Sequence, residues 1–90
     1  MLRIADDVVA RRLEDEVVLV HLATNRIYSL NATGARFWEL VADGVQPAQI
    51  AARLSSEFAV EPAEAEREVA ALSAELVQEG LVRADGAGDG

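Results

Sequence analysis

Few residues of this chain have side chains that could act in catalysis or bind a metal ion. None of them has a second catalytic or ligating residue nearby in the sequence. His21 is the single histidine, and the chain has no cysteine. A lone histidine among valines and leucines in a strand is typically a packed imidazole rather than a base or a metal ligand. The serines stand in no nucleophile-elbow pattern, and the glycines form no phosphate-binding loop. We therefore expect no catalytic residue, no metal and no cofactor, and we interpret the chain as a binding module.

Glutamates on one predicted helix have the clearest spacing of any charged residues. Four apolar residues recur at i, i+4, i+7 and i+11, which forms one narrow stripe along a helix: Ala65, Val69, Leu72 and Leu76. Five carboxylates follow one side of that stripe: Glu61, Glu64, Glu68, Glu75 and Glu79. An apolar seam bordered by acids suits an amphipathic, partly basic peptide. An ordinary surface helix would show the same pattern, and spacing alone favours that interpretation.

Composition and charge narrow the class of protein. Ninety residues, 51% of them hydrophobic, predict one small folded domain. The net charge of -8, carried by arginines and acids without any lysine, argues against non-specific binding of nucleic acid. The chain shows no signal peptide and no run long enough to span a membrane, so we expect a soluble cytoplasmic protein. We expect a domain over residues 1–83 and a disordered tail over residues 84–90.

The first part of the chain predicts three strands, over residues 8–13, 16–23 and 26–30. The second strand has two largely apolar faces, which is typical of a central strand or of a sheet that another element covers. On the third strand Tyr28 and Leu30 share one face, and Ile27 and Ser29 share the other. Short turns between the strands predict an antiparallel meander with two free edges. A free edge either promotes unwanted pairing with other chains or serves as a binding site.

Three helices are predicted after the strands, over about residues 32–42, 47–58 and 62–79. Asn31 is a suitable N-cap for the first helix, whereas Gln46 is a poor cap for the second. Phe37 and Trp38 on the first helix are expected to fill the core. The whole predicts an α+β fold in which a three-stranded antiparallel sheet precedes three helices.

Two other classes of protein have the same elements. A winged-helix DNA-binding protein should carry basic residues on its third helix, and residues 61–79 offer Arg67 against six glutamates. A structural dimerisation module remains open, because an apolar strand with two apolar faces could pair with a copy of itself.

The order of several short motifs resembles that of the PqqD-like family of peptide-recognition elements, over about residues 5–83. Gln46 departs from the family pattern, because a Ser or Thr cap is expected there. The matching marks are Leu30-Asn31, Thr33-Gly34, Trp38, Asp43-Gly44, Ile50-Ala51, Leu54, Leu76 and Gly80-Leu81.

The resemblance implies a winged-helix-like domain that binds the leader segment of a ribosomally synthesised precursor peptide. Such domains take the leader as an added strand at the sheet edge, between the third strand and the third helix. Carried onto this chain, the strand is formed by Arg26, Ile27, Tyr28, Ser29 and Leu30. The wall is formed by Ala65, Glu68, Val69, Leu72 and Leu76.

The resemblance also implies partners. A free-standing domain of this size is similar to the leader-binding subunit of lasso-peptide biosynthesis, which works with a separate leader protease and a cyclase. The alternative is a pyrroloquinoline quinone chaperone that passes its peptide to a radical enzyme, and the residues do not decide between the two. We expect a monomer or a weak dimer.

Overall fold

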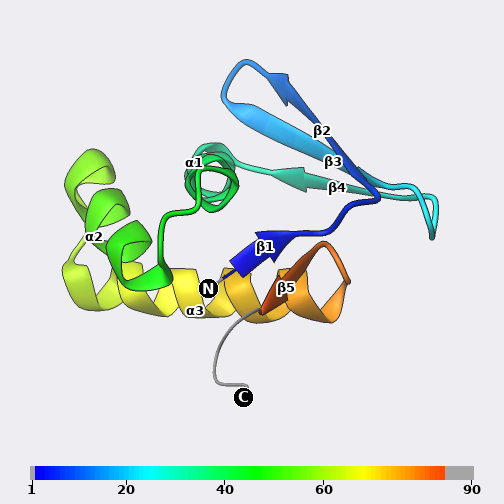
Figure 1. Ribbon diagram of the computed structural model, residues 1–90. Coiled ribbons are helices and arrows are strands. Elements are labelled where there is room, and N and C mark those ends of the chain that lie inside the picture. Colours follow the sequence, from blue (N-terminus) through cyan, green and yellow to red (C-terminus); the bar gives the residue numbers. More distant parts are fainter. Residues whose placement is uncertain (1, 85–90) are drawn as a thin grey trace.

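The computed structural model describes residues 2–84, which form two antiparallel sheets and three helices (Figure 1). The larger sheet has the strand order β2-β3-β4, and β1 pairs with β5 in a second sheet. The elements in chain order are β1 (Leu2–Ile4), β2 (Val8–Leu13), β3 (Glu16–His21), β4 (Arg26–Leu30), α1 (Ala32–Ala42), α2 (Pro47–Phe58), α3 (Pro62–Gln78) and β5 (Val82–Ala84).

The predicted fold class is confirmed, with a three-stranded antiparallel sheet followed by three helices in a winged-helix-like arrangement. The central strand is β3, as its two apolar faces predicted. It ends at His21, two residues before the predicted end, because residues 22–25 form the turn to β4. Asn25 has a φ of 62° there, a left-handed conformation that asparagine tolerates.

The pairing of β1 with β5 was not predicted. Leu2 lies opposite Ala84, and Ile4 lies opposite Val82. Strands of three residues are too short to show the alternation by which a strand is recognised in a sequence. The predicted tail begins at Ala84, which is the last residue of β5, and residues 85–90 lie outside the described residues.

The residues at the helix ends explain where the helices begin and end. The Asn31 side chain accepts a hydrogen bond from the Gly34 amide at 2.9 Å, as expected of an N-cap. Gln46 makes no such bond, and α2 instead begins with Pro47, whose missing N–H would be unpaired in any case. Gly80 follows α3 with a φ of +78°, where a side chain would be strained.

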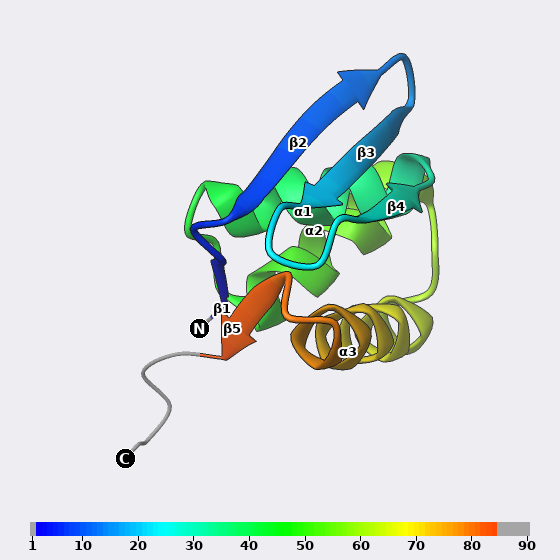
Figure 2. The ribbon, with the colours of Figure 1, turned by 90° about the vertical axis from the view of Figure 1, so that its right-hand side faces the viewer.

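The core lies between the larger sheet and the helices. Leu19 on β3 and Phe37 on α1 are fully buried, and Trp38 is 5% exposed, so the predicted core role of both rings is confirmed. The helices lie on one side of the sheet, where α1 packs against β3 and β4 (Figures 1 and 2). No element among residues 2–84 covers the opposite side of the sheet.

Candidate functional site

β4 is an edge strand, because it pairs with β3 and with no other strand among residues 2–84. In both Figure 1 and Figure 2 it is the strand of its sheet nearest to α3. The predicted guest-binding strand, residues 26–30, coincides with β4 from end to end. We call the surface formed by β4 and by the side of α3 that bears Glu68, Leu72 and Glu79 the β4–α3 surface.

One end of the β4–α3 surface is closed by a cluster of polar side chains. The Tyr28 hydroxyl donates a hydrogen bond to Glu79 Oε1 at 2.7 Å, and Arg26 Nη1 donates to the same oxygen at 3.2 Å. Tyr28, and less strongly the Glu79 carboxylate, raise the pKa of Arg26 above its usual value. These contacts hold the beginning of β4 against the end of α3.

The other end of the surface opens into a hollow of about 110 Å³. The hollow lies beyond Leu30, where the chain enters α1, and it is lined by Thr33, Leu54, Val60, Glu64, Ala65 and Glu68. Apolar walls next to two carboxylates suit a side chain that has an apolar stem and a cationic end.

The predicted residues of α3 divide into a surface group and a core group. Glu68 is exposed and Leu72 is half-buried. Leu72 lies seven residues before Glu79, hence on the same side of the helix, the side that reaches Tyr28. The other three predicted residues are buried in the core: Ala65 at 2%, Val69 at 4% and Leu76 at 3% exposure. A peptide on the β4–α3 surface would therefore meet Glu68 and Leu72 directly and Ala65 only within the small hollow, whereas Val69 and Leu76 would support it from the core.

Val69 also faces a second hollow, of about 430 Å³, on the opposite side of α3. That hollow is lined by residues of the second helix and the first strand as well, among them Leu2, Pro47 and Ala51. Val69 thus lies at the edge of the apolar stripe that is farther from Glu68, with Leu72 between the two.

Sequence reasoning missed several residues of this surface. Glu79 was assigned to the acidic stripe but not to the site, and Thr33, Leu54 and Val60 were not assigned to it at all. Tyr28 and Glu79 are 51 positions apart, and no local pattern indicates a contact over such a distance. The proximity of Leu54 and Ala65 depends on how α2 packs against α3, which the spacing within either helix does not define.

His21 is the packed imidazole that the sequence predicted, since the residue is 8% exposed. Its Nε2 atom lies 3.3 Å from Asp7 Oδ2, and its Nδ1 atom lies 3.3 Å from the Thr24 hydroxyl. A Cβ atom on Gly80 would lie 3.3 Å from the imidazole, so this ring fills the space beneath the end of α3. Within residues 2–84 no group of three His, Cys, Asp or Glu residues could hold a metal ion.

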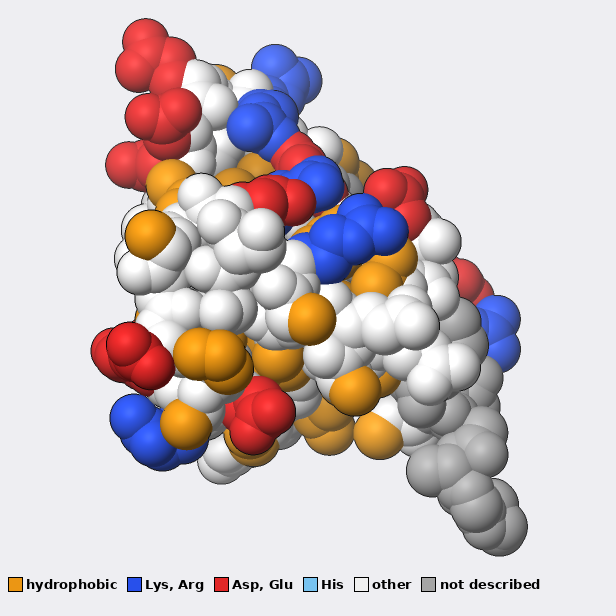
Figure 3. Space-filling model, turned by 90° about the vertical axis from the view of Figure 1, so that its left-hand side faces the viewer, with side chains coloured by type: hydrophobic (Ala, Val, Ile, Leu, Met, Phe, Trp, Pro, Cys, Tyr) orange, Lys and Arg blue, Asp and Glu red, His pale blue; other side chains and the backbone are white. Residues whose placement is uncertain are grey.

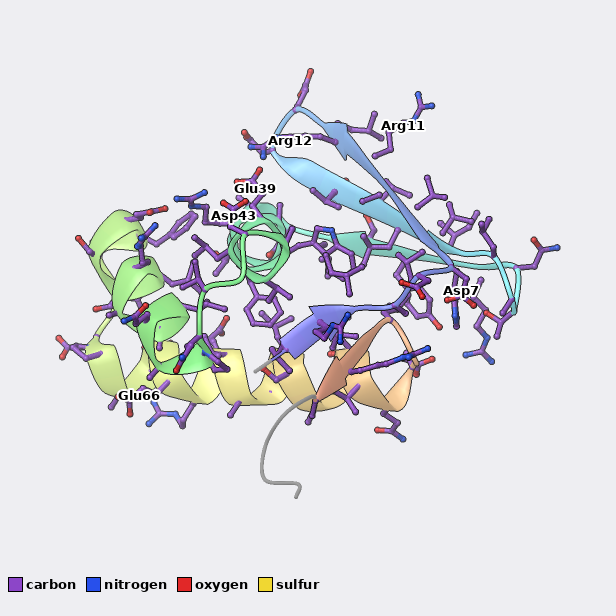
Figure 4. The ribbon with its side chains drawn as sticks, in the orientation of Figure 1. Asp7, Arg11, Arg12, Glu39, Asp43 and Glu66 are labelled. Atoms are coloured by element: carbon purple, nitrogen blue, oxygen red, sulfur yellow. The ribbon has the colours of Figure 1, made fainter. Side chains whose placement is uncertain are left out.

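A second group of charges lies away from the β4–α3 surface, on the face shown in Figure 3, where acidic and basic side chains meet. Arg36 on α1 binds Glu57 on α2 through Nε at 2.9 Å and Glu39 through Nη1 at 3.0 Å. Arg12 on β2 forms an ion pair with the same Glu39 (Figure 4). The hydrogen bond from Arg36 lowers the pKa of Glu57. These pairs tie the β2–β3 hairpin to the helices.

No helix in the described part of the chain is both long and apolar enough to cross a membrane. The family model described as Coenzyme PQQ synthesis protein D (PqqD) matches residues 16–82. A search of curated proteins gave no significant match.

Two solved structures are similar over nearly the whole chain. One is described as TbiB1 in complex with the TbiA(beta) leader peptide; it is 32% identical, with a TM-score of 0.87, and the match covers 93% of this chain and 98% of that one. The other is lasso peptide synthetase B1 complexed with the leader peptide, 30% identical with a TM-score of 0.85, covering 92% and 98% of the two chains.

Proposed function

The chain belongs to the PqqD family, and from this membership we propose that it binds the leader segment of a ribosomally synthesised precursor peptide in lasso-peptide biosynthesis. Both similar structures hold a leader peptide, and each matches this chain over almost its full length. The observation that carries the proposal is the unpaired edge of β4 beside α3. It offers backbone groups to a guest strand and side chains to select it.

In the proposed complex the leader pairs with β4 as a fourth strand of the larger sheet. Backbone hydrogen bonds along residues 26–30 hold the guest strand in place, and they require only an extended conformation. Alternate guest side chains then face the helices, because successive side chains of a strand point to opposite sides. Selection comes from the α3 side of the surface.

Leu72 and Glu68 supply two different contributions to that selection. Leu72 offers an apolar contact that a leader side chain can bury, which adds to affinity. Glu68 is exposed at the rim and next to the small hollow, so it attracts cationic leader residues before contact. Ala65, Val69 and Leu76 act from below, by fixing the position of α3 in the core.

The chain itself performs no bond-making step in this proposal. It delivers the bound leader to a leader protease and to the cyclase that closes the core peptide, and it does so in the cytoplasm as a monomer or a weak dimer. The family model's description favours one second candidate, delivery of a peptide to a radical enzyme of pyrroloquinoline quinone synthesis. The two leader-bound lasso structures favour the first.

Fluorescence polarisation against labelled leader peptides tests the proposal. The panel contains leaders of several lasso precursors, a pyrroloquinoline quinone precursor peptide and a scrambled lasso leader. We expect saturable binding of at least one lasso leader and none of the scrambled peptide. Tight binding of the pyrroloquinoline quinone precursor alone would favour the second candidate. Sedimentation that shows a stable dimer, combined with no peptide binding, would favour a dimerisation module instead.

A further inference from the structure

The side of the larger sheet that faces away from the helices is apolar and exposed. The strand register places Val9, Val20 and Ile27 side by side across β2, β3 and β4. Val9 is 49% exposed and Ile27 is 70% exposed, and both are aliphatic. We call this side of the sheet the outer face. The next row across the strands consists of Arg11, Val18 and Ser29.

The fold does not explain the apolar character of the outer face. The core residues of β3, Val17 and Leu19, point to the opposite side, where the helices cover them. No described element covers the outer face, which is turned toward the viewer in Figure 2. The side chains of a strand normally alternate, with apolar ones on the buried face of the sheet and polar ones on the face in contact with water. A row of three aliphatic side chains on the solvated face therefore indicates a surface that another molecule buries.

The charge on the outer face indicates what kind of molecule that is. Arg12 points toward Glu39, whereas Arg11, the preceding residue, projects away from the helices (Figure 4). Within residues 2–84 Arg11 forms no ion pair. The face therefore presents an aliphatic row beside the guanidinium group of Arg11, whereas the carboxylate of Glu16 on the same face already accepts a hydrogen bond from Ser29. A protein surface with apolar side chains around an Asp or Glu is complementary to it.

A second copy of the chain is a poorer match. It would bring another Arg11 and a further net charge of -8, and both oppose association. The outer face is also continuous with the proposed peptide site, because Ile27 and Ser29 belong to β4. A protein docked there would lie next to the bound peptide and leave the edge of β4 free.

We propose that the outer face docks the leader protease that acts on the bound peptide, through an apolar surface with a carboxylate opposite Arg11. This inference rests on the proposed function, since it takes the partner to be an enzyme that processes the leader-bound precursor. The outer face is present without the peptide, so the enzyme should bind the peptide-free chain as well.

The test uses the full chain, its leader peptide and the leader protease of the same pathway. Val9→Glu and Arg11→Glu alter the outer face, and Val77→Glu alters an exposed aliphatic residue on α3, 39% exposed, as the matched control. Calorimetry measures affinity for the protease without peptide, and fluorescence polarisation measures affinity for the leader. We expect both outer-face variants to weaken protease binding by roughly tenfold or more, with leader affinity and circular dichroism unchanged. The control should leave both affinities unchanged.

Three other results would contradict the inference, and each has a different meaning. Unchanged protease affinity in both variants, or an equal loss in Val77→Glu, would show that the enzyme docks elsewhere. A wild-type dimer in sedimentation that Val9→Glu dissociates would assign the outer face to a second copy. If the wild-type chain binds no leader, the proposed function fails and this inference fails with it, whereas intact leader binding confines the failure to the docking surface.

Discussion

The two faces of the larger sheet have similar side chains and opposite surroundings. Val17 and Leu19 on the inner face are 3% and 0% exposed, whereas Val18 and Val20, their neighbours on the outer face, are only partly covered. Hydrophobicity on the inner face is explained by the core. On the outer face it has no such explanation, so it indicates a partner. The β4 edge, where the peptide is proposed to bind, is the boundary between the two faces.

The largest expected effect tests the contrast between the faces directly. Leu19→Ala should lower the free energy of unfolding by about 2–5 kcal/mol, because it leaves a cavity under α1. Ile27→Ala, on the exposed side, should change it by no more than about 0.5 kcal/mol. Urea denaturation followed by circular dichroism measures both. Equal losses would mean that the outer face also contributes to the core, which would remove the contrast.

The second effect concerns the boundary between the faces. Leu72→Glu should weaken leader binding by about 100-fold, close to 2.7 kcal/mol, because a carboxylate replaces the apolar contact next to β4. Val77→Glu lies on the other side of α3 and should change the affinity less than about twofold. Fluorescence polarisation measures the affinities, and circular dichroism confirms folding. Val69→Glu is unsuitable as a probe, because Val69 is 4% exposed and its replacement should disrupt the core.

A smaller effect concerns the rate of leader association, which should depend on charge on the β4 side of α3 more than on charge on its other side. Glu68→Lys should slow leader association by roughly threefold and reduce its dependence on salt, since charges at a rim act mainly on encounter. Glu66→Lys makes the same change in charge beside the 430 Å³ hollow, away from β4. Stopped-flow fluorescence at two salt concentrations measures the rates. If both variants slow association equally, the effect arises from net charge rather than from the β4–α3 surface.

The smallest effect concerns the ion pair between Arg36 and Glu57, which joins α1 to α2. Because Arg36 lowers the pKa of Glu57, the pair stabilises the fold above the ordinary glutamate value of 4.5. This contribution is lost as the pH falls through the lowered pKa. The difference in stability between wild type and Arg36→Met should therefore be larger at pH 7 than at about pH 3. Urea denaturation at both pH values measures it. A difference independent of pH would assign the role of Arg36 to packing.

The sequence predicts the local structure well, because local structure depends on neighbouring residues. The two largely apolar faces of residues 16–23 indicated the central strand, and Asn31 indicated the start of α1. The β1–β5 pairing and the Tyr28–Glu79 hydrogen bond were not predictable, since each joins residues that are far apart in the sequence.

The candidate site was predicted in part, and the reason lies in the apolar stripe of α3. A stripe of apolar residues marks the side of a helix that is buried, so most of its members are taken up by the core of the protein itself. Ala65, Val69 and Leu76 lie there, whereas Leu72, at the margin of the stripe, stays half-buried. The surface available to a peptide is the margin, where the stripe meets the glutamates. The role of all five residues in binding stays a prediction.

The pairing of Leu2 with Ala84 determines how this domain can be tethered. Both described ends leave at one corner, to the left in Figure 2, while β4 and the adjacent part of α3 lie toward the right. A protease or cyclase fused to either end through a short flexible linker would be held at high effective concentration without lying over the peptide site. The same geometry makes either end suitable for a surface anchor or a fluorescent label.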